Sequence, residues 1–331
     1  MNGKNEINPA SLMQMVYGFQ RSRILLTAFE LRIFTVIGDE KKSAAEVAGA
    51  IRAGTRAAER LMDALVAMGL LEKNAGRYAN TEGAARFLVE GKPEFMSGFG
   101  HSVHLWDSWT TLTKAVRRGK TVRDRAPSES GDDWLVAFIA AMHYRASRRG
   151  RDIAKLLDLS GVTRLVDVGG GSGAFAMAFA KEKNDLHVTV FDLPNVLPLT
   201  RKYIAEAGLA AKVDTMPGNY MKDDLGGPYD MAFLSAIVHS NSDEENRLLI
   251  RKCAAALRAG GKIVIQDWIM SEDRTSPAAG AFFALNMLVN TEAGDTYTES
   301  EMRAWLSAAG FTDISRKDTE FDTSLLIASK E

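Results

Sequence analysis

Two residues that can move a proton, His239 and Asp267, each come at the end of an apolar run typical of a buried strand. Because the carboxyl ends of neighbouring parallel strands meet at one edge of a sheet, we expect the two side chains to lie within reach of each other. Histidine accepts a proton near neutral pH, and a carboxylate beside it fixes the tautomer of the ring. The pair therefore predicts a general base, with a polar residue at a helix start as the alternative for His239.

A glycine-rich turn at residues 169–173 offers a place for a cofactor. It follows the strand-like run Leu165-Val166-Asp167-Val168 and leads into an alanine-rich segment typical of a helix. Glycine adopts positive φ without strain and lets a ligand lie against bare backbone, and the helix N-terminus beyond it supplies unpaired N–H groups. The pattern predicts a nucleotide-like cofactor, with a turn that holds no ligand as the alternative.

Two classes of cofactor fit the spacing of these glycines. The pattern Gly169-x-Gly171-x-x-Ala174 fits the dinucleotide fingerprint, which holds a pyrophosphate. The pattern Asp167-x-Gly169-x-Gly171-x-Gly173 places an acid two residues before the first glycine. A carboxylate there would repel a pyrophosphate, so it favours a cofactor with a positively charged centre.

Polar residues also follow two further predicted strands. Asp192 comes directly after residues 187–191, where a carboxylate can accept hydrogen bonds from both hydroxyls of a ribose. A helix-start turn without a ligand is the alternative for this acid. Gly218-Asn219-Tyr220 follows the next strand, where we expect Asn219 to hydrogen-bond an adenine edge and Tyr220 to stack on its face.

Strands alternate with helix-length segments from residue 151 onward. This alternation indicates an α/β fold, a doubly wound parallel sheet with helices on both faces and the ligand beyond the carboxyl ends of the strands. The predicted strands are residues 164–168, 187–191, 213–216, 229–234, 262–268, 311–316 and 322–328.

The N-terminal third of the chain is predicted to be helical, with one small hairpin. Residues 10–37 carry more apolar side chains than one helix face can bury locally, so they pack against a partner chain or within the chain. A capping box at Ser43-x-x-Glu46, a helix from Thr55 and a hairpin over residues 70–79 predict a winged helix. Arginines at four-residue steps suggest a DNA-reading face. Interspersed acids favour a solvated helix face or dimer packing instead.

Composition excludes several classes of protein. The chain has 331 residues, a net charge of −1 and 46% hydrophobic residues, so its charge favours neither nucleic acid nor an anionic membrane. Its single cysteine, Cys253, rules out an internal disulfide framework and suits a reducing, cytoplasmic location. We find no apolar run of a signal peptide or membrane span, and the histidines lack a metal-ligand pattern.

These features together resemble the plant-type small-molecule O-methyltransferases and their bacterial relatives, the caffeate and acetylserotonin methyltransferase family. The resemblance covers nearly the whole chain, including Asp192-Leu193-Pro194 and the segment 298–311. It implies a Rossmann-like methyltransferase domain at residues 151–331 and a winged-helix dimerisation domain at residues 1–92. Connecting helices at residues 93–150 would line the acceptor pocket.

The resemblance also implies a function and a set of site residues. It implies a homodimer that transfers a methyl group from S-adenosylmethionine, without a metal, to a hydroxyl of a small acceptor, with His239 as general base. At the family's cofactor positions the chain has, among others, Leu193 and Ser235. At the family's acceptor positions it has Met142, Phe283 and Met287.

The chain departs from the family at some of these positions. His239-Ser240-Asn241 stands where the family usually has His-Asp-Trp, and Ser235 stands where a lysine is common. S- or N-methylation of a small molecule is therefore the nearest alternative. A nicotinamide dehydrogenase and a ligand-sensing DNA-binding regulator are the more distant ones.

Overall fold

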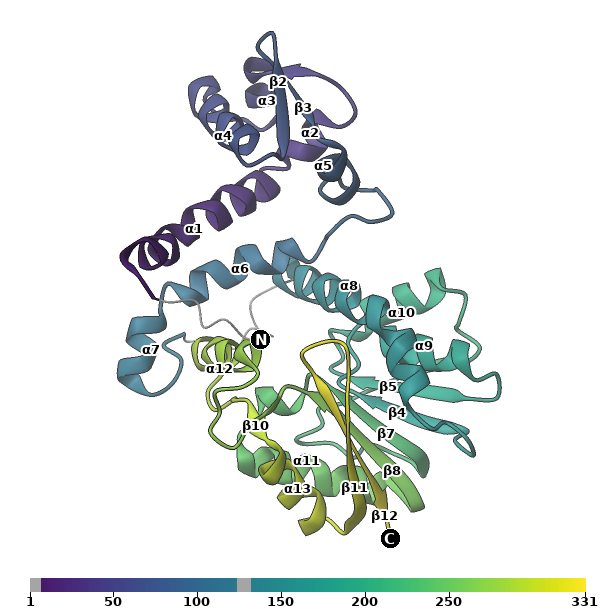
Figure 1. Cartoon of the computed structure of the whole chain (residues 1–331). Coiled ribbons are helices and arrows are strands. Elements are labelled where there is room, and N and C mark those ends of the chain that lie inside the picture. The colour runs from purple at the N-terminus through teal and green to yellow at the C-terminus, as the bar shows by residue number, and fades with distance from the viewer. Residues whose placement is uncertain (1–6, 124–131) are drawn as a thin grey trace. The chain divides into compact units, whose positions relative to one another are not determined.

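A computed structural model describes residues 7–123 and 132–331 of the chain. The chain divides between residues 104 and 105 into two compact units, which Figure 1 draws with their helices and strands labelled. Each unit has a hydrophobic core of its own. No helix within the described ranges is long and apolar enough to cross a membrane.

The N-terminal unit combines helices with a three-stranded antiparallel sheet of order β1-β3-β2. The predicted capping box opens α3, since Ser43 Oγ accepts from the Glu46 backbone N–H and the Glu46 carboxylate accepts in return from the Ser43 N–H. The predicted hairpin is also confirmed. The elements are α1 (Pro9–Glu30), α2 (Ile33–Ile37), β1 (Lys42–Ser43), α3 (Ala44–Ala50), α4 (Thr55–Ala67), β2 (Leu71–Asn74), β3 (Arg77–Asn80) and α5 (Glu82–Phe87).

The first helix leaves an apolar surface uncovered. Side chains along its N-terminal half are about half exposed or more, among them Met15 at 71%, Val16 at 61% and Phe19 at 54%. Exposed apolar side chains gathered on one element mark an interaction surface. Among the described residues of the N-terminal unit, none covers these side chains.

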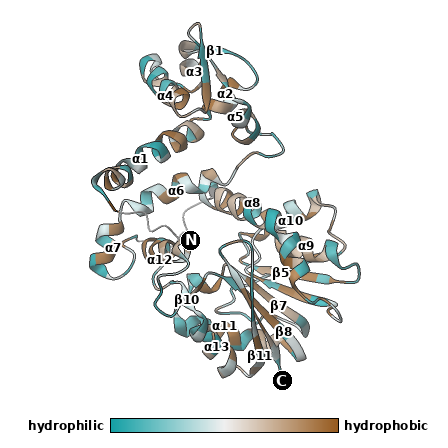
Figure 2. Cartoon of the chain, viewed as in Figure 1, coloured by the Kyte–Doolittle hydropathy of each residue, from teal (hydrophilic) through white to brown (hydrophobic). Residues whose placement is uncertain are grey.

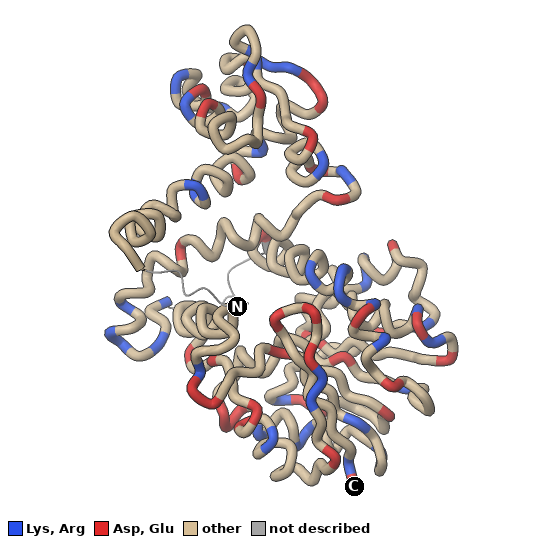
Figure 3. Tube along the Cα trace, viewed as in Figure 1, with Lys and Arg blue, Asp and Glu red and all other residues tan. Residues whose placement is uncertain are grey.

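Charge in the N-terminal unit does not form a basic face. Arg60 lies 3.4 Å from both Glu59 and Asp63, and Lys73 also pairs with Asp63 at 2.7 Å. Figure 3 shows acidic and basic residues interspersed along this unit. Acidic residues that interrupt the basic ones in the sequence thus form ion pairs with them.

The C-terminal unit is built on a seven-stranded sheet of order β11-β12-β8-β7-β4-β5-β6. Its central strands are among the most hydrophobic parts of the chain (Figure 2). The strands are β4 (Arg164–Val168), β5 (His187–Asp192), β6 (Val213–Pro217), β7 (Tyr229–Ser235), β8 (Leu257–Asp267), β11 (Phe311–Asp318) and β12 (Ser324–Lys330), with a separate pair β9 (Ile269–Met270) and β10 (Tyr297–Thr298).

Helices cover the sheet and extend beyond it. They are α7 (Leu112–Arg118), α8 (Asp132–Leu156), α9 (Ala174–Glu182), α10 (Leu197–Glu206), η2 (Val238–Ser240), α11 (Asp243–Ala256), α12 (Ala278–Asn290) and α13 (Glu299–Ala308), and α6 (Phe99–Trp109) crosses the division between the units.

All seven predicted strands exist, but the sheet is not wholly parallel. β12 runs antiparallel to both β8 and β11.

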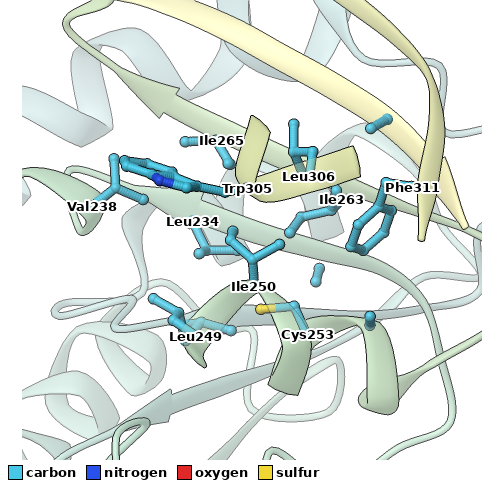
Figure 4. Close-up of a cluster of buried hydrophobic side chains, with 14 of the residues drawn as sticks. Leu234, Val238, Leu249, Ile250, Cys253, Ile263, Ile265, Trp305, Leu306 and Phe311 are labelled. Carbon is cyan, nitrogen blue, oxygen red and sulfur yellow. The ribbon is translucent and has the colours of Figure 1, made fainter. Parts of the chain in front are cut away.

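The core of this unit lies on both faces of the sheet. One cluster packs α11 and α13 on β7, β8 and β12, and Figure 4 shows Trp305, Leu306 and Ile250 meeting there. Cys253 lies in this cluster and is fully buried, which raises the pKa of its thiol to about 12. This cysteine is therefore structural, because a buried, protonated thiol is a poor nucleophile.

Candidate active site

His239 and Asp267 meet at the carboxyl end of the sheet, as predicted. β7 and β8 are adjacent and parallel, and His239 follows β7 in the turn η2, whereas Asp267 ends β8. His239 Nδ1 lies 2.9 Å from Asp267 Oδ1 and 3.0 Å from Oδ2, and both side chains are buried. With Nδ1–H donated to the carboxylate, the neutral ring carries its lone pair on Nε2, ready to accept a proton.

Aromatic rings pack around this histidine. The Phe283 ring on α12 meets the imidazole edge to face at 4.7 Å and stacks on Trp268 at 4.0 Å. Trp268 directly follows Asp267 and donates its backbone N–H to Asp267 Oδ1 at 2.9 Å. The sequence analysis missed Trp268, although its place directly after the strand-ending acid was an available signal. Met287 is buried on the same helix, and Met142 is half-buried on α8.

The glycine turn follows β4 and is shaped by close contacts that a Cβ atom would fill. Gly169, Gly171 and Gly173 all have positive φ. A Cβ at Gly170 would lie 2.6 Å from Asp167 Oδ2, and one at Gly218 would lie 2.3 Å from the Phe191 ring. Glycine, which has no Cβ atom, is therefore required at these two positions.

Asp192 ties the second strand to the glycine turn. Its Oδ2 accepts the N–H of Gly171 at 2.8 Å, and its Oδ1 accepts the N–H of Leu193 at 2.7 Å. Burial raises the pKa of Asp192, and these two hydrogen bonds oppose the rise. A carboxylate has about four acceptor directions, so two stay free for the hydroxyls of a ribose.

Asp167 is a buried acid beneath the turn. It is 1% exposed, and neither carboxylate oxygen has a hydrogen-bond partner among the residues that the structure describes. Burial, with the nearby charge of Asp192 as a second cause, raises the pKa of Asp167 to about 7. An orphaned buried carboxyl is costly unless a positive charge compensates it.

His143 also contacts the turn, and the sequence analysis gave it no such place. Its Nδ1 lies 3.0 Å from Ser172 Oγ, and its ring stacks on Tyr203 of α10 at 3.9 Å. Burial lowers the pKa of His143, which favours the neutral ring. Nothing in the residue spacing of α8 singled out this histidine.

The remaining predicted cofactor residues make contacts within the chain. Ser235 Oγ donates to Gln266 Oε1 at 3.1 Å on the neighbouring strand, and Asn219 Oδ1 accepts the N–H of Met221 at 2.9 Å. Tyr220 lies beside the glycine turn, with its ring 3.9 Å from where a Cβ of Gly169 would stand.

The loop after α12 carries two acids, Glu292 and Asp295. The structure places Glu292 in an exposed ion pair with Lys120 at 2.7 Å and Asp295 in one with Arg274 at 3.3 Å. The opposite charges of these partners hold both acids in solvent. No group of three or more His, Cys, Asp or Glu that could hold a metal occurs in residues 7–123 and 132–331.

Comparison with known proteins decides the family. Residues 125–312 match the O-methyltransferase domain, and residues 13–90 match the O-methyltransferase dimerisation domain. The chain belongs to the O-methyltransferase family. It is 33% identical to the 3-hydroxy-5-methyl-1-naphthoate 3-O-methyltransferase of Streptomyces sahachiroi over 92% of this chain and 90% of that one.

Other relatives of this O-methyltransferase are similar over almost their full length. The tetracenomycin polyketide synthesis 8-O-methyl transferase of Streptomyces glaucescens is 30% identical over 97% of both chains. The human N-acetylserotonin methyltransferase, solved in complex with S-adenosylmethionine, superposes with a TM-score of 0.85 at 27% identity over 99% of both chains. The protein is an S-adenosylmethionine-dependent methyltransferase with a Rossmann-like fold, which confirms the resemblance found in the sequence.

The residues present fit this cofactor. The half-buried carboxylate of Asp192 faces the glycine turn with acceptor capacity to spare, as a ribose requires. The orphaned carboxyl of Asp167 suits a positively charged ligand and would disfavour a pyrophosphate. The chemistry of these two carboxyl groups therefore disfavours a nicotinamide dehydrogenase, as the family match does.

One prediction concerns Gly294, which lies against the turn that carries His239. A Cβ at Gly294 would stand 2.5 Å from the His239 carbonyl oxygen. Gly294→Ala is therefore expected to displace the turn and lower kcat about tenfold or more, because small misplacements of a catalytic group are costly. Gly83→Ala on α5 is the matched control, since a Cβ there meets open space. Equal kcat in both variants would show that the turn tolerates the displacement.

Proposed function

We propose that this enzyme transfers the methyl group of S-adenosylmethionine to a hydroxyl of a small aromatic or hydrophobic acceptor, with His239 as the general base. The observation that carries the proposal is the buried pair of His239 Nδ1 and Asp267 at 2.9 Å, on the same sheet edge as the glycine turn. S-adenosylmethionine, when bound, would supply an electrophilic methyl group on its sulfonium sulfur, with neutral S-adenosylhomocysteine as the leaving group when the S–CH₃ bond breaks.

The side chains of the protein provide positioning and proton transfer. Asp267 holds the imidazole with Nδ1 protonated, and Nε2 would then accept the proton of the acceptor hydroxyl. The resulting imidazolium is stabilised by the carboxylate of Asp267. Phe283 and Trp268 form an apolar wall next to the ring, which suits a planar acceptor. Met142 and Met287 are proposed to contact the same acceptor.

Two relatives support an aromatic hydroxyl as acceptor. The Streptomyces sahachiroi enzyme is named for 3-O-methylation of a hydroxynaphthoate, and the Streptomyces glaucescens enzyme is named for 8-O-methylation in polyketide synthesis. We propose a phenolic acceptor of similar size and a homodimer formed through the N-terminal unit. The exposed apolar side chains of α1 and the match to a dimerisation domain support the dimer.

A labelled-methyl screen tests the proposed reaction. The purified enzyme is incubated with S-adenosylmethionine that is radiolabelled in its methyl group and with panels of phenols, amines and thiols. Label is expected on one or more phenols and on no amine or thiol. Label found only on amines or thiols would show that the enzyme methylates nitrogen or sulfur and not oxygen.

A second prediction follows from the pKa of about 7 at Asp167. A positive charge bound over the turn favours the charged carboxylate, so it lowers this pKa and releases a proton when binding occurs below pH 7. The affinity for S-adenosylhomocysteine, whose amino group is positive, is therefore expected to rise from pH 5 to about pH 7 and then level off. Calorimetric titration across this range measures it.

The matched control is Asp167→Asn, which cannot release that proton. Its affinity for S-adenosylhomocysteine should be weaker than that of the unchanged protein at pH 8, and it should vary much less between pH 5 and pH 7. If the unchanged protein binds equally well at pH 5 and pH 8, Asp167 does not face the charge of the ligand.

A further inference from the structure

A buried network of amide and phenol groups surrounds the turn that carries His239, and the proposed mechanism does not yet use it. Asn241 is 5% exposed, and its side-chain Oδ1 accepts a hydrogen bond from Tyr220 Oη at 3.2 Å. Its Nδ2 donates to Asn246 Oδ1 at 3.1 Å, and its carbonyl oxygen accepts from Tyr297 Oη at 2.5 Å. Each partner belongs to a different element or loop.

The network closes on the residue just before His239. Asn246 Nδ2 donates to the carbonyl oxygen of Val238 at 2.9 Å, and the Asn241 backbone N–H donates to the same oxygen at 3.3 Å. Val238 and Asn241 flank the turn η2 on either side of His239. A single 3₁₀ turn has little rigidity of its own, so these bonds at both ends decide where the imidazole lies.

Tyr220 connects this network to the cofactor turn. Its ring lies beside Gly169, and its hydroxyl is the one that reaches Asn241. Burial, helped by the charge of Asp192, raises the pKa of Tyr220 to about 12, so the hydroxyl stays protonated and can donate. One residue therefore touches both the glycine turn and the turn of the proposed base.

We propose that Asn241 is a positioning residue for His239 and that Tyr220 links it to the cofactor turn, an inference that rests on His239 being the base. Asn246 and Tyr297 complete the set of partners of Asn241, so both its side-chain polar atoms and its carbonyl oxygen are hydrogen-bonded, which favours one fixed arrangement.

Two substitutions separate positioning from packing. Tyr220→Phe keeps the ring against the glycine turn and removes only the hydroxyl. Asn241→Leu keeps the volume and removes the amide. Both are expected to lower kcat about 10- to 100-fold, the cost of a misplaced catalytic group. Tyr220→Phe should leave the affinity for S-adenosylhomocysteine within about twofold, because the ring remains.

A matched control removes a buried tyrosine hydroxyl elsewhere. Tyr78 is fully buried in the N-terminal unit and donates its hydroxyl to Asp63 Oδ1 at 2.7 Å. Tyr78→Phe should lower thermal stability and leave kcat unchanged. If Asn241→Leu fails to fold, Tyr220→Phe against this control still decides the question.

The decisive measurement repeats Tyr220→Phe in a His239→Ala background. A residue that acts through His239 costs nothing further once the imidazole is gone, so kcat of the double variant should equal that of His239→Ala. The same fold-loss in both backgrounds, or unchanged kcat in Tyr220→Phe alone, overturns the inference while the base assignment stands. Unchanged kcat in His239→Ala alone overturns the proposed function, and the inference with it.

Discussion

Replacing His239 by alanine is expected to lower kcat for methyl transfer about 10²- to 10⁴-fold, the usual contribution of a general base. The imidazole is held by Asp267 at 2.9 Å in a buried site, so no other side chain replaces its lone pair. Steady-state kinetics with labelled donor and a phenolic acceptor measures kcat. The affinity for S-adenosylhomocysteine, measured by calorimetry, should stay unchanged, because the glycine turn and Asp192 follow or end other strands, β4 and β5.

His187→Ala is the matched control for this substitution. His187 is exposed at the start of β5, at the opposite end of the sheet from the site, and its loss should leave kcat unchanged. A His239→Ala variant with undiminished kcat would mean that the acceptor ionises without a base. In that case the acceptor would be a thiol or another readily ionised group, and not a hydroxyl.

Replacing Asp192 by alanine is expected to weaken the binding of S-adenosylhomocysteine about 100-fold or more. The carboxylate holds the backbone of Gly171 and Leu193, and we propose that it also accepts two hydrogen bonds from ribose hydroxyls, which would be worth roughly 1.5 to 3 kcal/mol each. Calorimetric titration measures the loss. With saturating donor, kcat should fall far less than in His239→Ala.

Asp214→Ala provides the control for loss of an acid from the same part of the sheet. Asp214 is exposed on β6, the strand beside β5, and makes no contact with the glycine turn. Its substitution should leave the affinity for S-adenosylhomocysteine unchanged. If Asp192→Ala binds as tightly as Asp214→Ala does, the ribose lies elsewhere.

The fold was largely predictable from periodicity and turn signals. β4 matches its predicted bounds because its β-branched run stops abruptly at a glycine. The direction of β12 was not predictable. Its residues are buried whichever way the strand runs, so the hydrophobic pattern of residues 324–330 carries no information on whether the strand is parallel.

The site was predictable where it depends on strand ends and was not where it depends on loops. His239 and Asp267 follow adjacent strands, so topology alone brings them together. The partners of Asn241 come from separate loops and a helix, and their meeting depends on packing that no local pattern encodes. For the same reason the ion pair of Glu292 with Lys120 was not predictable, since the two residues lie 172 positions apart in the sequence.

The most direct test of the central claim uses an acceptor that carries both a phenolic hydroxyl and a primary amine. The enzyme is given this compound with S-adenosylmethionine labelled with ¹³C in its methyl group, and NMR identifies the atom that receives the label. We predict an O–¹³CH₃ product, because we propose that His239, at the same end of the sheet as the glycine turn, removes a hydroxyl proton. An N–¹³CH₃ product formed by the same enzyme would contradict that claim.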